Sequence, residues 1–230
     1  MLKLGERLMQ VASFVPSGAK LADIGTDHAY LPIYLVHHNK IAYAVAGEVN
    51  QGPYQAAQDA IESYGLAEKI SLRLGNGLEI LKPAEVDTVS IAGMGGGTVA
   101  DILAKSPDIT CSLQRIIIQP MNGAALIREW LMTHGWVICD EALVKEDGRL
   151  YEIIVAERGW AAEIDSILYD VGPVIWLKRL PLLKEHIEHL LFQHKRVLME
   201  MDASPNAKLS SKYYSYVQKI KDLELKLACL

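Results

Sequence analysis

The chain has 230 residues, half of them hydrophobic, which is enough for one large core and a smaller appendage. Its three cysteines lie far apart, so they exclude a disulfide scaffold and a zinc spacing and favour a reducing, cytoplasmic location. The formal net charge of −5 argues mildly against a nucleic-acid partner, and no apolar run approaches the roughly 18 residues of a membrane span.

The first 160 residues alternate between helical and extended patterns. Leu8, Val11 and Val15 have helical spacing, and Pro16 and Gly18 end that first helix. Strands are expected at 20–24, 41–48, 86–97 and 115–122, and a strand followed by a turn at 70–77. Helices are expected at 5–15, through 34–35, at 51–64, beginning at 99–103, and at 124–134. Two more strands, 136–145 and 151–156, flank the turn EDGR as an antiparallel pair. The alternation predicts an α/β fold, a Rossmann-like parallel sheet with helices on both faces.

Polar residues and glycines gather at the carboxyl ends of five predicted strands. In chain order they are GTDH, Glu48, GNG, AGMGGG and QPMN. Ligands of open parallel sheets bind beyond these strand ends, where the strand order reverses. The five clusters therefore predict a single site at one edge of the sheet.

The first of these turns has the wrong charge for a dinucleotide. Aligned on GxGxxG, it has Gly25, then Asp27, then Tyr30, so a carboxylate stands where the backbone would approach two phosphates. This turn suits a ligand that has no phosphate and carries a positive centre, and S-adenosylmethionine is such a ligand. Asp23 and the turn around Gly25 would then lie near its methionine portion.

Later strand ends supply partners for a nucleoside. Glu48 is placed to accept two hydrogen bonds from a ribose diol, although a solvated strand end is the alternative interpretation. Asn76 can bond the adenine amino edge. The glycines of AGMGGG would let a flat base approach the backbone, or they form only a flexible or close-packed loop.

Six segments together resemble one family. DIGTDHAYLP, GEVNQGP, GNGLEIL, IAGMGGG, IIQPMN and EDGRLYEI, in this order, resemble the bacterial tRNA (adenine(22)-N1)-methyltransferase family. The resemblance is dense over residues 4–157, and it implies a class I Rossmann-like domain that uses S-adenosyl-L-methionine to methylate N1 of adenine 22 in tRNA. The family commonly has an aspartate where Asn76 stands and a serine where Gly5 stands.

The resemblance also implies the site residues. The cofactor side is expected to comprise Asp23, Gly25, Asp27, His28, Glu48, Val49, Asn76, Gly93 and Met94. Substrate contacts are expected from Arg7, in the family's N-terminal RL motif, and from Gly95, Gly96, Gln119, Pro120 and Asn122. The last three form only a turn in the alternative interpretation.

Asp27 and His28 are the candidate catalytic residues. Adenine N1 already has a lone pair, so no strong base is needed, but the ring gains positive charge during transfer. Asp27 would stabilise that charge, and His28 would position the base or relay the N6 proton. Alternatively, Asp27 only caps the following helix, and His28 is structural. The target base has to be extruded from folded tRNA.

Residues 161–230 are expected to form a second, helical domain after a methyltransferase domain at 1–160. Residues 182–201 have helical spacing, and a heptad seam follows at Leu209, Tyr213, Tyr216, Ile220, Leu223 and Leu227. The two segments predict an antiparallel coiled-coil hairpin or, alternatively, an ordinary two-helix cap. We expect a monomer, with a dimer through the seam as the alternative.

The net charge of this tail is more favourable for binding RNA than the net charge of the whole chain. Residues 165–230 carry 10 Lys and Arg against 8 Asp and Glu, whereas the remainder carries 13 against 20. His186, His189 and His194 lie along its first helix, but no carboxylate or cysteine completes a ligand set there, so no metal is expected.

Two other functions compete with a tRNA methyltransferase. One is a small-molecule S-adenosylmethionine-dependent methyltransferase, in which the hairpin is a lid or a dimer contact. The other is a non-enzymatic nucleotide-sensing or RNA-binding module. The charged turn disfavours the module, because binding alone would not require Asp27 beside a sulfonium. The basic tail and the resemblance disfavour the small-molecule enzyme.

Overall fold

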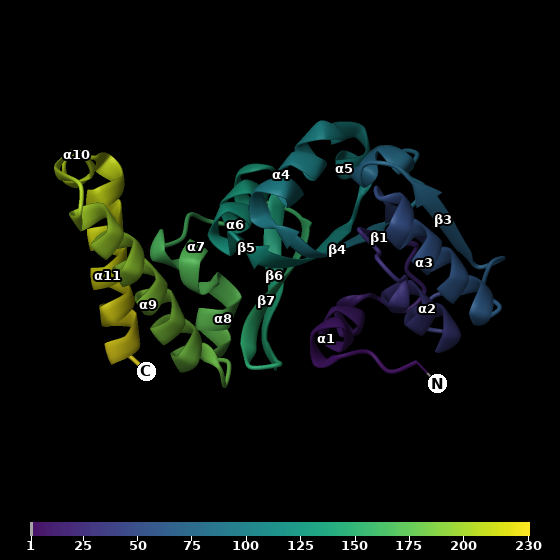
Figure 1. Ribbon diagram of the computed structural model, residues 1–230, viewed down its shortest axis with the longest axis horizontal. Coiled ribbons are helices and arrows are strands. Elements are labelled where there is room, and N and C mark those ends of the chain that lie inside the picture. The colour runs from purple at the N-terminus through teal and green to yellow at the C-terminus, as the bar shows by residue number, and fades with distance from the viewer. Residues whose placement is uncertain (1) are drawn as a thin grey trace. The chain divides into compact units, whose positions relative to one another are not determined.

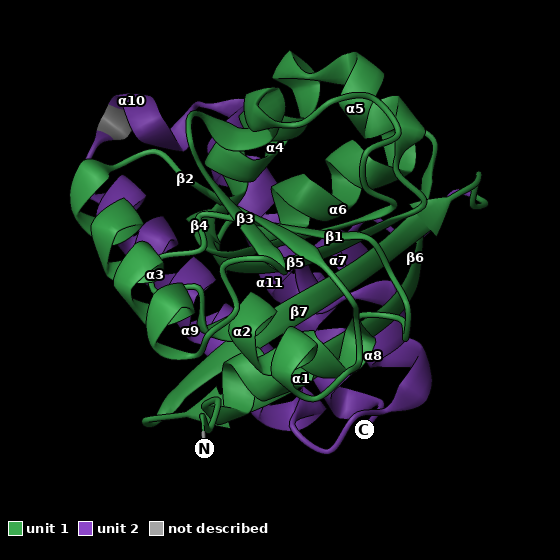
Figure 2. Ribbon diagram, turned by 90° about the vertical axis from the view of Figure 1, so that its right-hand side faces the viewer, with its two compact units in different colours: residues 1–162 green, residues 163–230 purple. Residues whose placement is uncertain are grey.

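The computed structural model describes residues 2–230, so Met1 lies outside the described residues, as does the side chain of Pro205. The chain divides into two compact units, residues 1–162 and 163–230, coloured separately in Figure 2. The boundary expected from the sequence is after residue 160, and the assignment of the units as separate domains stays a prediction.

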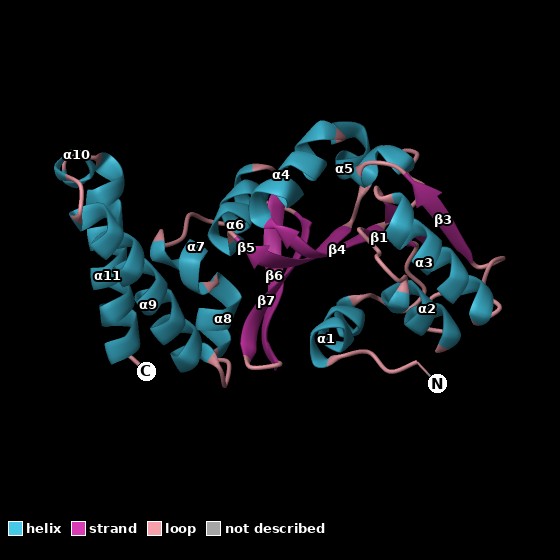
Figure 3. Cartoon of the chain, in the orientation of Figure 1, coloured by secondary structure: helices cyan, strands magenta, loops and turns pink. Residues whose placement is uncertain are grey.

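Unit 1 contains every helix and strand expected from the sequence. Its elements are α1 (Glu6–Phe14), β1 (Leu21–Ile24), α2 (Tyr30–His37), β2 (Ala44–Glu48), α3 (Gln51–Ser63), β3 (Ile70–Leu74), the 3₁₀ helix η1 (Gly77–Ile80), β4 (Thr88–Gly95), α4 (Gly96–Lys105), α5 (Pro107–Ser112), β5 (Arg115–Asn122), α6 (Ala124–Thr133), β6 (Trp136–Glu146) and β7 (Arg149–Arg158). Helix α5 was not expected; it is a short helix with Pro107 in its first turn (Figure 3).

The seven strands form one sheet in the order β3-β2-β1-β4-β5-β7-β6. The first five strands are parallel, and β7 runs antiparallel to both β5 and β6. The predicted antiparallel pair around the EDGR turn is therefore confirmed. The strand order reverses between β1 and β4, so the carboxyl ends of these two strands mark the place where a ligand is expected.

Helices cover both faces of this sheet. Helices α1, α2 and α3 pack on one face, and α4, α5 and α6 lie together on the other (Figure 1). The central strands are buried on both sides: Ala22, Val45 and Val89 are fully inaccessible to solvent. This burial is why the strands appear in the sequence as continuous apolar runs without polar alternation. The expected α/β, Rossmann-like class is confirmed.

Unit 2 is helical. It contains α7 (Ile167–Val171), α8 (Pro173–Lys178), α9 (Leu183–Asp202), α10 (Pro205–Lys208) and α11 (Ser211–Ala228). Helices α9 and α11 pack against each other within the chain, and Ile187, Leu191, Ile220 and Leu223 are buried. Leu209 was expected in this seam but is 78% exposed. The reason is that Ser210 caps α11 by accepting a hydrogen bond from the Tyr213 backbone, so the helix begins after Leu209.

Two of the tail histidines have structural partners inside unit 2. His186 Nε2 lies 3.1 Å from the carbonyl oxygen of Val171, and His194 Nε2 lies 3.3 Å from Oδ1 of Asp170. Burial alone would raise the pKa of Asp170, but hydrogen bonds from His194 and Lys219 outweigh it and hold the pKa below its ordinary value. Among the described residues, no three His, Cys, Asp or Glu side chains gather as a metal site requires.

No helix in the described part of the chain is both long enough and apolar enough to cross a lipid bilayer.

Candidate functional site

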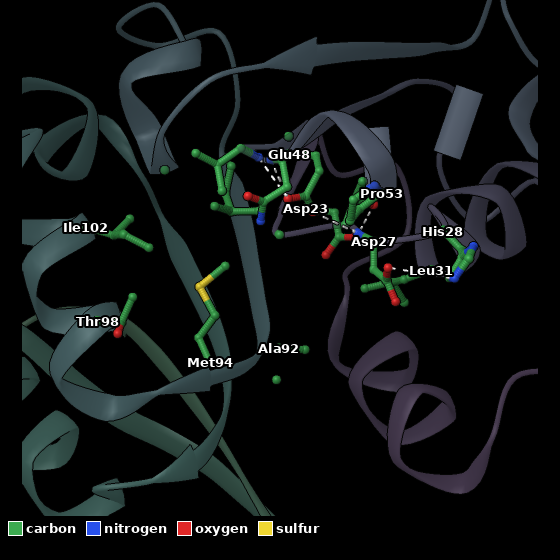
Figure 4. A pocket seen from close by; sticks show the side chains of 18 of the residues that line it. Asp23, Asp27, His28, Leu31, Glu48, Pro53, Ala92, Met94, Thr98 and Ile102 are labelled. Atoms are coloured by element: carbon green, nitrogen blue, oxygen red, sulfur yellow. Dashed lines mark hydrogen bonds and ion pairs between the residues drawn. The ribbon is translucent and has the colours of Figure 1, made fainter. Parts of the chain in front are cut away.

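A pocket of about 470 Å³ lies at the carboxyl ends of β1, β2, β3 and β4 (Figure 4). Its volume is in the range of small-molecule and cofactor sites. The pocket is at the reversal of strand order, where the sheet topology predicts it. Met94, Thr98 and Ile102 lie on one side of it, and Asp27 and His28 lie on the other.

Most of the residues expected at the site line this pocket. They are Arg7, Asp23, Gly25, Asp27, His28, Glu48, Val49, Asn76, Gly93 and Met94. The five others, which were expected to contact substrate, do not line it: Gly95, Gly96, Gln119, Pro120 and Asn122. The structure also adds lining residues that were not expected, among them Thr26, Tyr30, Pro53, Thr98 and Ile102.

The turn after β1 is built from left-handed backbone. Gly25 has φ of 72°, a left-handed value that favours glycine, and a Cβ there would also displace the flexible end of the Met94 side chain. Asp27 and Ala29 also have positive φ, 53° and 55°, which few side chains adopt without strain. This conformation leaves the Asp27 side chain 69% exposed at the rim.

The helix-cap interpretation of Asp27 is wrong. The residue that precedes the first turn of α2 is Ala29, and no described side chain caps that helix end. The Asp27 backbone N–H instead donates to Oε2 of Glu48, at 3.3 Å. The Asp27 carboxylate is thus free of a capping role and is available at the pocket rim.

Glu48 is an organising residue rather than a solvated strand end. Its side chain is 6% exposed, and Oε1 accepts hydrogen bonds from the backbone N–H groups of Val49, at 2.8 Å, and Asn50, at 3.0 Å. Together with the bond from Asp27, these contacts join the end of β2 to the turn after β1. The carboxylate is therefore fixed in place at the pocket wall by backbone donors.

Asp23 lies deeper, at the base of the same turn. Its two carboxylate oxygens accept hydrogen bonds from the hydroxyls of Ser90 and Thr26, both at 2.7 Å. Complete burial raises the pKa of Asp23 above 3.8; the two hydroxyls lower it, and the negative charge of Glu48 raises it again. Ser90 could have been found from the sequence, because it is a polar residue inside the apolar run of β4.

The raised pKa of Asp23 leads to a prediction about pH. A cation bound beside Asp23 favours the ionised carboxylate, so binding lowers its pKa and releases a proton. Affinity for a cationic ligand should therefore fall as pH drops from neutrality through the raised pKa of Asp23 towards 3.8. Calorimetric titration with S-adenosyl-L-methionine across this range should show the decline, and Asp23→Asn should flatten it. Equal slopes in the two proteins would contradict the prediction.

Gln119 and Pro120, which were expected to touch an acceptor base, do not line the pocket, so that contact stays a prediction. Gln119 is 0% exposed, and Pro120 is buried beside it. Oε1 of Gln119 accepts a hydrogen bond from Nη1 of Arg7 at 2.6 Å, and Arg7 also approaches Glu146, with Nε 3.6 Å from Oε2. Gln119 is thus a positioning residue that holds the Arg7 guanidinium at the edge of the pocket.

The glycine-rich junction of β4 and α4 is closely packed at one point. A Cβ on Gly96 would collide with the carbonyl oxygen of Gly123, so Gly96 serves the contact between α4 and the turn after β5. Gly95 pairs with Asn122 across the sheet, and Asn122 is exposed outside the pocket. The close-packed alternative therefore holds for Gly96, and Gly93 is the glycine of this segment that lines the pocket.

The pocket is anionic. Asp23, Asp27 and Glu48 contribute three carboxylates, and the guanidinium that lines the pocket among the described residues, that of Arg7, is already close to Glu146. Such a site repels a diphosphate and attracts a ligand with a positive centre. The fixed carboxylate of Glu48 can accept a pair of hydroxyl donors, and the exposed carboxylate of Asp27 can stabilise positive charge on a group entering from the rim.

Comparisons with known proteins agree with this chemistry. Residues 4–154 match the family described as "Methyltransferase domain". The tRNA (adenine(22)-N(1))-methyltransferase of Bacillus subtilis (strain 168) is 45% identical over 175 residues, 76% of this chain and 74% of that protein.

Solved structures extend the match to almost the whole chain. The B. subtilis m1A22 tRNA methyltransferase TrmK is 35% identical, with a TM-score of 0.90 over 99% of this chain and 100% of that chain. Streptococcus pneumoniae Sp1610 in complex with S-adenosyl-L-methionine is 36% identical, with a TM-score of 0.87 over 98% and 100% of the two chains.

Proposed function

Since the chain belongs to the tRNA (adenine(22)-N1)-methyltransferase family, we propose that it transfers a methyl group from S-adenosyl-L-methionine to N1 of adenine 22 in tRNA. The observation that carries the proposal is the anionic turn after β1, tied to Glu48 at the reversal of strand order. This turn is unsuited to a diphosphate cofactor and suited to a sulfonium.

The residues present fit this cofactor. S-adenosyl-L-methionine supplies an electrophilic methyl group carried on a positively charged sulfur. Glu48 would accept hydrogen bonds from the ribose hydroxyls, and Asn76, at the end of β3, would accept one from the adenine amino group through its side-chain carbonyl. Asp23 and the backbone around Gly25 would hold the methionine portion.

The chain's own part in the reaction is orientation and electrostatics. The acceptor nitrogen N1 has a lone pair, so the protein does not have to remove a proton before transfer. Asp27 stabilises the positive charge that the purine ring gains and accepts a hydrogen bond from the exocyclic N6–H. His28, whose Nε2 lies 3.7 Å from Oδ1 of Asp27, helps to orient the base or relay the N6 proton. Holding the reacting atoms in line supplies much of the remaining acceleration.

The direct test uses labelled S-adenosyl-L-methionine with unmodified tRNA, followed by digestion and mass mapping of the modified nucleotide. The proposal requires 1-methyladenosine at position 22. Transfer to a metabolite but not to tRNA would support the small-molecule methyltransferase. Cofactor binding without turnover on any acceptor would support the non-enzymatic module.

We propose that unit 2 provides the main tRNA-binding surface outside the pocket. It carries 10 Lys and Arg against 9 Asp and Glu, a surplus of one positive charge, and Arg196 on α9 and Lys212 and Lys221 on α11 are exposed. Phosphate contacts from such residues give affinity that falls steeply with salt.

The location in the cytoplasm, where tRNA is modified, fits the three separate, unpaired cysteines.

Reversing the charge of exposed basic residues tests whether unit 2 binds tRNA. The triple variant R196E/K212E/K221E should weaken tRNA binding on the order of 10-fold. The plot of the logarithm of the binding constant against the logarithm of the salt concentration should become shallower by about one unit of slope for each lost phosphate contact. Affinity for S-adenosyl-L-methionine should stay the same. The matched control K20E/K69E/K82E reverses three exposed lysines of unit 1 that lie outside the pocket. Equal losses in both triple variants would show that unit 2 has no special part in binding tRNA.

A further inference from the structure

Two aromatic rings lie at the rim of the pocket, and the mechanism above uses only one of them. The rings of His28 and Tyr30 are stacked, with centroids 5.2 Å apart and planes inclined by 14°. Both residues line the pocket. They remain open to solvent, with 47% of the His28 side chain and 42% of Tyr30 exposed. Two stacked, partly exposed aromatic rings thus lie beside the candidate catalytic carboxylate.

The backbone is strained in order to present these rings. Asp27 and Ala29, the residues on either side of His28, both have left-handed φ although neither is glycine. Tyr30 follows as the first residue of α2. Residues held in sparsely populated conformations cluster where function requires a particular arrangement. Here the left-handed residues bring two ring faces, two positions apart in the sequence, into a nearly parallel stack.

The rings have no structural partner that would account for their position. Among the described residues, the Tyr30 hydroxyl makes no hydrogen bond, and the His28 ring has only its 3.7 Å approach to Asp27 and its stack with Tyr30. A tyrosine that served the core would be buried, and one that served a hydrogen-bond network would use its hydroxyl. The part of Tyr30 that remains available for contact with a ligand is therefore the face of its ring.

We propose that Tyr30, backed by His28, is a stacking platform for a nucleobase of the tRNA substrate. The inference rests on the proposed function. An extruded base loses the stacking of its neighbours, and proteins that bind unpaired bases replace it with aromatic side chains. The platform adjoins Asp27, which is proposed to contact the N6 edge of the target adenine. The base that best fits the platform is therefore the extruded adenine itself.

The test separates the ring from its hydroxyl. Tyr30→Ala should raise the KM for tRNA about 5- to 150-fold, the range expected for loss of one base–aromatic stack. Tyr30→Phe should stay within a few-fold of the unsubstituted protein. Tyr30→Leu keeps apolar bulk without an aromatic face and should resemble Tyr30→Ala. Affinity for S-adenosyl-L-methionine, measured by calorimetry, should change in all three variants by much less than the KM for tRNA changes in Tyr30→Ala.

A second readout follows the base directly. A tRNA transcript with 2-aminopurine at the target position should have quenched fluorescence when saturated with the unsubstituted protein, because the base stacks on Tyr30, and brighter fluorescence with Tyr30→Ala. Tyr43→Ala is the matched control, since Tyr43 is similarly exposed but precedes β2 at the opposite end of the sheet. It should change neither KM nor fluorescence.

The outcomes distinguish this inference from the function on which it rests. If the unsubstituted protein forms 1-methyladenosine but Tyr30→Ala has an unchanged KM and an unchanged fluorescence signal, the platform is wrong and the proposed function stands. If Tyr30→Phe is as impaired as Tyr30→Ala, the hydroxyl acts rather than the ring, and the platform is again wrong. If the unsubstituted protein leaves tRNA unmethylated, both the proposed function and the proposed stacking platform are wrong.

Discussion

Asp27→Asn is expected to lower the single-turnover rate of methyl transfer to tRNA about 10²–10³-fold, the size of effect seen when one preorganised electrostatic contact is removed from a transition state. The substitution removes the negative charge that is proposed to stabilise the methylated purine. Asparagine tolerates the left-handed backbone at this position, where φ is 53°. The side chain is exposed, so the fold should not depend on its charge.

Two comparisons make the Asp27 result specific. Asp147→Asn is the matched control, because Asp147 is exposed, has a left-handed φ of 49° and lies in the β6–β7 turn, outside the pocket. It should leave the rate unchanged. Asp27→Ala should lose the charge and also strain the turn by about 1–2 kcal/mol, so its melting temperature should fall as well. A rate for Asp27→Asn within a few-fold of the unsubstituted protein would remove Asp27 from the mechanism.

The second large effect is expected at Glu48. Glu48→Gln should weaken binding of S-adenosyl-L-methionine roughly 10- to 150-fold, as expected for the loss of charged hydrogen bonds worth about 1.5–3 kcal/mol. The glutamine would have an amide N–H₂ in place of one carboxylate oxygen. That group would face a backbone donor, either Asp27 on one side or Val49 and Asn50 on the other. The turn after β1 should loosen, so the transfer rate at saturating cofactor should also fall.

Calorimetry for affinity and single-turnover kinetics for rate would measure the two consequences of Glu48→Gln separately. Glu68→Gln, an exposed glutamate just before β3, gives the control for loss of a negative charge elsewhere in unit 1. Unchanged cofactor affinity in Glu48→Gln would mean that this carboxylate organises the loop only and does not bind the ribose.

The elements of unit 1 could be predicted from the sequence because their signals are local. Apolar spacing and turn residues indicated the strands and helices, and the run at residues 86–97 indicated a strand buried on both faces. In both units the short helices were the exceptions. Helix α5 and helices α7 and α8 have six residues or fewer, which is too short for a period of 3.6 residues to be recognised. At Leu209 the heptad pattern continued past the true helix start, because the cap at Ser210 outweighed it.

The residues expected on the cofactor side line the pocket, whereas most of those expected to contact the substrate do not, and the roles of both sets stay predictions. Four clusters at the ends of β1 to β4 converge on the pocket, as the rule for parallel sheets requires. The fifth cluster, in the last four residues of β5, does not line it, because Gln119 is turned into the protein and bonds Arg7. In the sequence, Tyr30 was noted only because it occupies the position of the third glycine of the dinucleotide-binding motif GxGxxG.

The sequence by itself determined the fold class, the anionic character of the turn after β1 and, through the family resemblance, the reaction. These depend on short-range patterns and on residue identities, which are fully present in the chain. The tertiary structure alone decided the direction and partners of each side chain. It turned Asp27 outward and Gln119 inward, and it surrounded Glu48 with three backbone donors. Such assignments depend on left-handed backbone angles and on contacts between residues far apart in the sequence, such as Arg7 and Gln119, which are 112 positions apart, and no local pattern encodes them.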